Sequence, residues 1–198
     1  MKQLLIATHN LDKVKEIRGI LAGLDVTLSP LTEYPAVPPT VEDADTLAGN
    51  ALKKAEEAFR ATGLPTAADD TGLEVFYLNG EPGVYSSRYA GEGASYADNR
   101  KKLLKQLRGV PPRRRGAQFR TVVAFVPKAG VQHLFEGVCP GVIIEQERGD
   151  GGFGYDSIFL PDGHAETFGE MPLSLKNTLS HRARAFTNFA EFLRRGAW

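Results

Sequence analysis

Near its start the chain reads Lys2-Gln3-Leu4-Leu5-Ile6-Ala7-Thr8-His9-Asn10-Leu11-Asp12-Lys13, an apolar run that breaks into a polar turn. Apolar residues then recur at helical spacing, at positions 11, 14, 17, 20, 21 and 24. This pattern predicts a strand over 2–7, a turn, and a helix that Asn10 caps and that ends near Gly23. A strand followed directly by a helix is the first unit of an α/β fold.

The same alternation continues along the chain and later gives way to consecutive strands. Four prolines within 29–40 predict an irregular loop, and Thr46 or Asp45 is expected to cap the next helix, which ends near Gly63. We expect helices at 47–59, 96–107 and 182–193. We expect strands at 26–28, 66–68, 73–78, 119–126, 131–135, 138–146 and 155–160, the second and third of these around an Asp-Asp-Thr-Gly corner. The order predicts a mixed α/β sheet with a helix-covered part and a meander part, within one domain over 1–198.

Composition narrows the function classes. The 198 residues are 42% hydrophobic, and Lys plus Arg equals Asp plus Glu at 24 each. Balanced charge gives no field that favours a nucleic-acid polymer or an anionic membrane. The single Cys139 lies in an apolar run and is expected in the core. The first apolar stretch is too short for a signal peptide, and no run reaches the roughly 20 apolar residues of a membrane span. These features predict a cytoplasmic protein.

The first candidate site is the turn Thr8-His9-Asn10-Leu11-Asp12-Lys13, between the first strand and the first helix. The amides and partial positive charge of a helix N-terminus bind anions, and Lys13 in the first turn adds a full charge. The alternative is that Asn10 only caps the helix and Lys13 is solvated. The residues alone leave both interpretations open.

The second candidate is Asp69-Asp70-Thr71-Gly72. Carboxylate oxygens at the end of a strand suit a hard Mg²⁺ ion, and one of the two could also take a proton from an attacking water. Adjacent strand residues point to opposite faces, so both can serve one site only if the strand breaks into a turn, which Gly72 would allow. The alternative is an ordinary polar turn. Glu42, with Asp43 and Asp45, precedes a helix, where carboxylates either bind metal or favour the helix dipole.

Two further candidates lie in the second half of the chain. The segment 149–156 matches G-x-G-x-x-G, but the following residues read as a strand, which excludes a dinucleotide fingerprint. A glycine-rich corner with Phe153, Tyr155 and Asp156 suits stacking on a flat base, or else is a hairpin with core aromatics. Lys176 and the stretch 180–182 supply donors for an anion or a base edge, unless Ser180 only caps the last helix. The sequence contains no P-loop motif and no cluster of Cys and His residues at the spacing of zinc ligands.

Five segments occur in a fixed order, namely Ala7-Thr8-His9-Asn10-Leu11-Asp12-Lys13, Asp69-Asp70-Thr71-Gly72-Leu73, Pro82-Gly83-Val84-Tyr85-Ser86-Ser87-Arg88-Tyr89, Gly152-Phe153-Gly154-Tyr155-Asp156 and Ser180-His181-Arg182. Together they resemble the inosine triphosphate pyrophosphatase family, also called the Ham1-like family, nearly from end to end. The resemblance implies an elongated mixed α/β fold of two lobes, with a long central sheet, a nucleotide-binding cleft and usually a homodimer. It implies Mg²⁺-dependent hydrolysis, with Mn²⁺ as an alternative, of the triphosphates of inosine, deoxyinosine and xanthosine to monophosphate and pyrophosphate.

The resemblance also implies roles for individual residues. Asp70 corresponds to the catalytic carboxylate, which is linked to the metal together with Glu42 and Asp69. The substrate ligands it implies are Thr8, His9, Asn10, Leu11, Asp12 and Lys13 for the triphosphate, Thr71 with its hydroxyl, Phe153, Gly154, Tyr155 and Asp156 for the base and sugar, and Lys176, His181 and Arg182 as readers of the nucleotide. The implied partners are small nucleotides, not nucleic-acid polymers or membranes.

Some positions depart from the family pattern. Leu47 and Gly49 stand where the family carries Phe and Glu, and Ser157 follows Asp156 where Pro is usual. Two other functions remain alternatives: a pyrophosphatase of modified pyrimidine nucleotides, and a nucleotide-binding module without catalysis. The pair Asp69 and Asp70 argues against the second, because a protein that only binds anions gains nothing from two carboxylates beside them.

Overall fold

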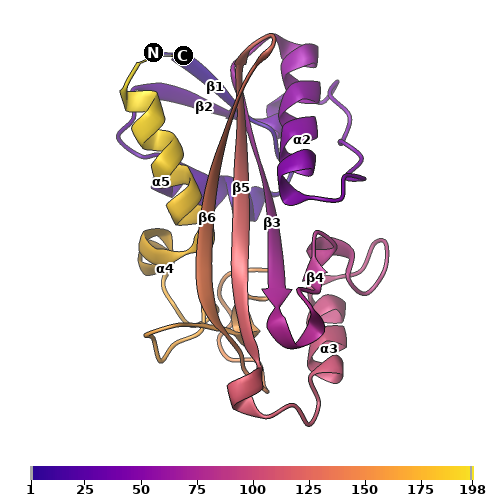
Figure 1. Ribbon diagram of the computed structural model, residues 1–198. Coiled ribbons are helices and arrows are strands. Elements are labelled where there is room, and N and C mark those ends of the chain that lie inside the picture. The colour runs from indigo at the N-terminus through magenta and orange to yellow at the C-terminus, as the bar shows by residue number, and fades with distance from the viewer. Residues whose placement is uncertain (1, 197) are drawn as a thin grey trace. The chain divides into compact units, whose positions relative to one another are not determined.

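The computed structural model describes residues 2–196 and 198 and shows a mixed sheet with helices (Figure 1). The strands are β1 (Lys2–Ile6), β2 (Val26–Pro30), β3 (Thr66–Val75), β4 (Pro82–Gly83), β5 (Gly116–Lys128), β6 (Val131–Ile143) and β7 (Phe159–Pro161). The α-helices are α1 (Leu11–Ile20), α2 (Leu47–Thr62), α3 (Tyr96–Gln106), α4 (Leu173–Leu179) and α5 (His181–Arg194). The strand order is β2-β1-β3-β5-β6-β7, with β4 paired to β3. Because β1 pairs in parallel with β2 and β3 whereas β7 is antiparallel to β6, the predicted mixed α/β sheet is confirmed.

The chain forms two compact units. The first contains the residues up to Asp70, Thr121–Gly137 and the segment that begins at His181, and the second contains Thr71–Arg120 and Val138–Ser180. Within the described residues, no helix is long and apolar enough to cross a membrane.

In the first unit the side chains of β1 alternate between two apolar clusters. Leu4 and Ile6 join the cluster that contains Ile17 of α1 and the α5 aromatics, whereas Leu5 and Ala7 join the cluster that contains the α2 alanines. This is the period of two residues expected of a strand, and it requires helices on both faces. The sheet of the first unit is therefore covered by α1 and α5 on one face and by α2 on the other.

Both helices that follow strands in the first unit begin at the predicted caps. Asn10 Oδ1 accepts hydrogen bonds from the amides of Asp12 (2.9 Å) and Lys13 (3.2 Å), and Thr46 Oγ1 accepts one from Gly49 (3.0 Å). Helix α2 ends at Gly63, which has a φ of 70°. A left-handed residue at this position is the common way for a helix to stop, and glycine adopts it without steric cost.

The second unit has its own core, formed by α3 and by the parts of β3, β5 and β6 that belong to this unit. It contains Leu73, Leu103, Phe119, Phe159 and Phe168, all of them buried. Cys139 is also buried in this cluster, as predicted. Helix α3 begins at Ser95 with a complete capping box, in which Asp98 returns the hydrogen bond.

Three expectations about secondary structure were wrong. Strand β3 continues through the expected corner, and Gly72 instead allows β4 to approach: a Cβ there would lie 2.6 Å from the Gly83 carbonyl oxygen. The three strands expected at 119–126, 131–135 and 138–146 are two long strands, β5 and β6, because the expected break near Gly137 lies inside β6. The expected strand at 155–160 is a 3-10 turn, Asp156–Ile158, followed by the short β7. Helix α4 was not expected.

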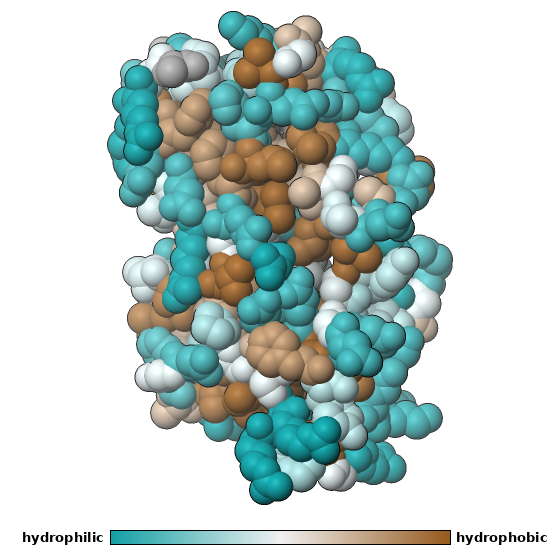
Figure 2. All heavy atoms as spheres, in the orientation of Figure 1, coloured by the Kyte–Doolittle hydropathy of each residue, from teal (hydrophilic) through white to brown (hydrophobic). Residues whose placement is uncertain are grey.

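Figure 2 shows hydrophobic residues lying among hydrophilic ones on the face it presents. The large hydrophobic side chains that are exposed are scattered along the sequence: Leu11, Val41, Phe76, Tyr77, Tyr85, Tyr96 and Leu134. Exposed residues of this kind are normal on folded proteins.

Gly137 of β6 provides a test of how α5 is positioned. A Cβ there would collide with the carbonyl oxygen of His181 and the amide nitrogen of Ala185, both backbone atoms of α5. We expect Gly137→Ala to lower the free energy of unfolding by about 1–3 kcal/mol, because helix and strand must separate. Urea denaturation measures this, with Lys128→Ala at the exposed end of β5 as a control that changes little. Wild-type stability of Gly137→Ala would show that the contact is not tight.

Candidate active site

The candidate site lies at the carboxyl end of β1 and beside Asp69 and Asp70 in the middle of β3. Leu5 pairs with Thr66 and Ile6 with Ala67 in parallel register. The carboxyl ends of parallel strands meet at one edge of a sheet, so the turn after β1 lies beside the residues that follow Ala67 on β3. Thr8 Oγ1 accepts a hydrogen bond from the Asn10 amide (3.1 Å), which fixes this turn through its own side chains.

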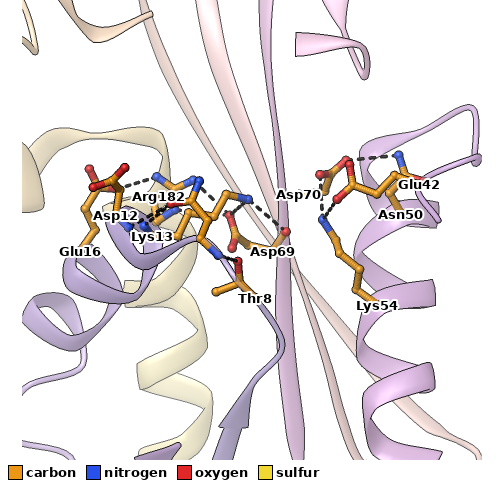
Figure 3. Close-up of polar contacts among 11 residues, drawn as sticks. Thr8, Asp12, Lys13, Glu16, Glu42, Asn50, Lys54, Asp69, Asp70 and Arg182 are labelled. Atoms are coloured by element: carbon orange, nitrogen blue, oxygen red, sulfur yellow. Dashed lines mark hydrogen bonds and ion pairs between the residues drawn. The ribbon is translucent and has the colours of Figure 1, made fainter. Parts of the chain in front are cut away.

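Asp69 and Asp70 point to opposite faces of β3 (Figure 3). Asp69 faces Lys13 of α1 and Arg182 of α5, whereas Asp70 faces α2. The reason is that β3 is an unbroken strand here, and adjacent strand residues alternate. The break that would have turned both carboxylates toward one site does not occur, so each serves a different group of side chains.

The group around Asp69 is a buried set of two anions and two cations. Asp69 Oδ2 lies 3.0 Å from Lys13 Nζ, and it accepts hydrogen bonds from Arg182 Nη2 (3.1 Å) and Nε (3.3 Å). Arg182 Nη1 donates to Glu16 Oε2 at 2.5 Å. Arg182 is only 1% exposed, so its charge depends on Asp69 and Glu16 rather than on water. Sequence reasoning missed Glu16, although a glutamate between Val14 and Ile17 on the apolar side of α1 was a readable signal.

The pKa shifts of this group follow from burial and from the neighbouring charges. Burial alone would raise the pKa of Asp69, but Lys13 and Arg182 outweigh it and hold this pKa well below the usual range. Burial lowers the pKa of Lys13, and the attraction of Asp69 opposes that effect. Asp69 is therefore an anion that holds Lys13 and Arg182 in place.

The group around Asp70 lies on the other face of β3. Lys54 Nζ lies 2.9 Å from Asp70 Oδ1 and 2.8 Å from Glu42 Oε1, and so bridges the two carboxylates. Asn50, one turn earlier on α2, donates from Nδ2 to Asp70 Oδ2 at 3.4 Å and accepts from the Ala44 amide at 3.0 Å. Asn50 thereby fixes the loop before α2 to the helix. Sequence reasoning missed Asn50 and Lys54, whose spacing of four residues was the available signal.

The pKa of Asp70 is shifted in the opposite direction to that of Asp69. Burial raises the pKa of Asp70, and Lys54 and Lys13 oppose that rise without cancelling it. Burial would lower the pKa of Lys54, but Asp70 and Glu42 outweigh it and raise this pKa. A carboxylate with a raised pKa is a stronger base, which suits it to accept a proton from water near neutral pH.

Asp70 and Glu42 are also the carboxylates that fit a divalent ion. Both contact the same ammonium, so their oxygens are within reach of one cation, and carboxylate oxygens are the ligands that Mg²⁺ prefers. In the part of the chain that the structure describes, no cluster of three or more His, Cys, Asp or Glu side chains could hold a metal. Mg²⁺ is commonly bound by one or two carboxylates with substrate phosphates and waters, which agrees with this donor set.

Gly49, which stands where the resemblance places a Glu, lies at the start of α2. A Cβ at this position would lie 2.8 Å from the Ala44 Cβ and 3.1 Å from Thr46 Oγ1. A side chain there would push the preceding loop away from the helix. Glycine therefore lets the loop that carries Glu42 lie close to α2.

The second unit contains the glycine-rich candidate. Asp156 Oδ2 accepts from the Phe153 amide (2.8 Å) and from Lys176 Nζ (2.5 Å), and this ammonium lies 5.0 Å from the centre of the Phe153 ring. Tyr155 is buried and donates from its hydroxyl to the Ser86 carbonyl oxygen at 2.9 Å. The structure thus brings Phe153, Asp156 and Lys176 together. A 3-10 turn and a strand, not an α-helix, follow Gly154, which confirms that this is not a dinucleotide fingerprint.

The remaining predicted residues differ in exposure. His9, Leu11 and Asp12 are exposed at the start of α1, and Thr71 is partly buried on β3. His181 is 2% exposed at the first position of α5. The roles of these residues toward a nucleotide stay predictions.

A model of the Ham1 family matches residues 4–192. The chain is 46% identical to a dITP/XTP pyrophosphatase of Geobacter sulfurreducens, over 98% of this chain and 97% of that protein. It is 48% identical to a dITP/XTP pyrophosphatase of Porphyromonas gingivalis, over 98% of each chain. Its structure is similar to that of a HAM1 protein from Coxiella burnetii, with a TM-score of 0.89 and 36% identity, over 98% of this chain and 100% of the other.

The Asp69 group predicts an effect on stability. Asp69→Asn leaves Lys13 and Arg182 buried with only Glu16 as an anion, so we expect the free energy of unfolding to fall by about 3–5 kcal/mol. Denaturant unfolding measures the loss. Asp43→Asn is the matched control, because Asp43 pairs with Lys53 at 2.6 Å with a side chain that is 65% exposed, and its replacement should change little. Equal, small losses in both variants would contradict the structural role of Asp69.

Proposed function

The chain belongs to the Ham1 family, and from this premise we propose that it hydrolyses non-standard purine nucleoside triphosphates to the monophosphate and pyrophosphate. The substrates are the triphosphates of inosine, deoxyinosine and xanthosine. The observation that carries the proposal is the charge arrangement around β3, with Lys13 on one face and Lys54, Asp70 and Glu42 on the other. Such a set offers cations for a polyphosphate and carboxylates for a metal beside one strand.

In the proposed mechanism, the turn after β1 and the first turn of α1 hold the triphosphate. Lys13 supplies the charge, and the amides at the start of α1 supply donors and the positive end of the helix dipole. Asp69 keeps the ammonium of Lys13 in position through their ion pair. Positioning of this kind, rather than covalent chemistry, is the main contribution of a protein to phosphoryl transfer.

Asp70 is proposed as the base that takes the proton from an attacking water. Asn50 orients the carboxylate from α2, which supports that role. Asp70 and Glu42 are also the proposed ligands of Mg²⁺, or of Mn²⁺. A divalent ion there would neutralise negative charge on the polyphosphate and polarise the phosphoryl group. Asp69 receives a positioning role instead, because its carboxylate faces Lys13 and Arg182.

We propose that the nucleoside part contacts the group of Phe153, Asp156 and Lys176 in the second unit. Phe153 offers a ring for stacking, and Lys176 offers a donor for the 6-keto oxygen of hypoxanthine or xanthine. A nucleotide contact of His181, at the first position of α5, stays a prediction. Adenine presents an amino group at that position, and a donor left unpaired by the wrong base can cost discrimination on the order of 10⁴-fold. Arg182 is proposed to act through Asp69, since its guanidinium already bonds Asp69 and Glu16. The homodimer implied by the resemblance stays a prediction.

A nucleotide panel tests the proposed function. With Mg²⁺ present, we expect inosine, deoxyinosine or xanthosine triphosphate to give monophosphate and pyrophosphate far faster than adenosine triphosphate does. The measurement is the rate for each nucleotide, with pyrophosphate and orthophosphate assayed separately. Equal rates with adenosine triphosphate, or stepwise release of orthophosphate, would contradict the proposal, and preference for a modified pyrimidine would favour the alternative pyrophosphatase.

Asp70→Asn tests the base. The change keeps the size of the side chain but removes its charge and its proton-accepting oxygen, so kcat should fall by about 10²-fold or more. Nucleotide should still bind, because Lys13 and the turn after β1 are unchanged. Asp45→Asn is the control, since Asp45 is an exposed carboxylate of the same acidic segment as Glu42. Near-normal kcat in a folded Asp70→Asn protein would remove Asp70 from the mechanism.

A further inference from the structure

Lys54 occupies the place between the two carboxylates that are proposed to bind the metal. Its Nζ contacts Asp70 Oδ1 and Glu42 Oε1 at 2.9 and 2.8 Å (Figure 3). The side chains of Lys54 and Asp70 are 11% and 8% exposed, so little water is available to replace these contacts. A cation that bridged the same two oxygens would have to displace this ammonium or lie against it.

We propose that Lys54 is an exchangeable internal cation, which competes with the divalent ion for the Asp70–Glu42 pair and weakens metal binding by the nucleotide-free protein. The inference rests on the proposed function only in taking these two carboxylates as the metal ligands. It assigns Lys54 a role in the order of binding that is separate from any contact it makes with substrate.

The charges around the pair support the exchange. Asp70 and Glu42 with Lys54 carry a net charge of −1, and without Lys54 they would carry −2. A divalent ion that approaches the occupied pair meets a like charge at contact distance, and repulsion at this range is strong where water is scarce. The other ionised groups that act on Lys54 include Asp69, across the strand. Asp69 is already held by Lys13 and Arg182 and cannot take over as the partner of Lys54.

The side chains also differ in their freedom to move. A lysine has a flexible stem, so its ammonium can leave the pair without a change in the helix. Asn50 is held by the Ala44 amide and keeps Asp70 oriented when Lys54 leaves. A triphosphate supplies new oxygens to the displaced ammonium, so nucleotide and metal should each favour the binding of the other, and this coupling is reciprocal.

The neighbouring lysine provides a matched control. Lys53 pairs with Asp43 at 2.6 Å at the surface, and among the described residues it makes no ion pair with Asp70 or Glu42. Replacing it removes the same charge from the same helix and leaves the metal pair intact. Any effect of general charge on metal affinity would therefore appear in Lys53→Met as well as in Lys54→Met.

The test is a titration of the full-length, nucleotide-free protein with Mn²⁺ alone, in which free Mn²⁺ is followed by its electron paramagnetic resonance signal. We expect Lys54→Met to bind Mn²⁺ about 10-fold more tightly than wild type, a typical size for such coupling. Lys54→Arg, which keeps the charge, and Lys53→Met should bind as wild type does. Circular dichroism confirms folding, and Lys54→Gln replaces Lys54→Met if the latter does not fold.

Two outcomes overturn the proposal. Either unchanged or weaker Mn²⁺ binding by folded Lys54→Met and Lys54→Gln, or equal tightening in Lys53→Met, shows that Lys54 does not compete with the ion. The result is independent of the nucleotide panel. If the wild-type protein hydrolyses inosine triphosphate but the Lys54 variants bind Mn²⁺ as wild type does, only the proposed exchange is wrong. If Lys54→Met binds Mn²⁺ more tightly but the wild-type protein hydrolyses none of the nucleotides, only the proposed function is wrong.

Discussion

The unbroken course of β3 through Asp69 and Asp70 is the constraint on which the site depends. Because the strand does not turn, its pleat sends the two carboxylates to opposite faces, and each must find its own cations. The helices that cover these faces supply them: α1 and α5 provide Lys13 and Arg182, and α2 provides Lys54. The packing of the first unit and its chemistry are therefore consequences of the same alternation, since the apolar residues of β1 divide between the same two helix layers.

Burial makes these pairings obligatory. A charge that is removed from water is costly unless it is paired and hydrogen-bonded, and removal of one partner leaves the other exposed to that cost. Around Asp69 the charges are balanced, two against two, and the guanidinium of Arg182 is enclosed. Around Asp70 they are not balanced, because two carboxylates share one ammonium. The balanced group is suited to hold its geometry, whereas the unbalanced one retains affinity for a further cation.

The parts of the fold that could be predicted were those with local causes. Asn10 and Thr46 were readable as caps because a cap depends on a few neighbouring residues. The continuity of β3 could not be predicted, because in the sequence Gly72 looks like a turn residue. In the structure, Gly72 is needed because β4 approaches β3 too closely there for a side chain. Lys54 could not be separated from Lys53 by sequence, since only the packing of α2 shows which lysine faces Asp70. Likewise, the partners of Arg182 lie 113 and 166 residues away, at Asp69 and Glu16.

These placements change what the pair of aspartates says about catalysis. From sequence, two adjacent carboxylates beside an anion site argued against a protein that only binds nucleotides. A protein of that kind would still need Asp69, because Lys13 and Arg182 would otherwise be buried without enough negative charge. Asp70 and Glu42 are not required in this way. Without them, Lys54 could extend into solvent, at a lower free-energy cost than pairing it with two partly buried carboxylates. The case for hydrolysis rather than binding therefore rests on the excess negative charge at Asp70 and Glu42, on the face of β3 that Asp69 does not reach.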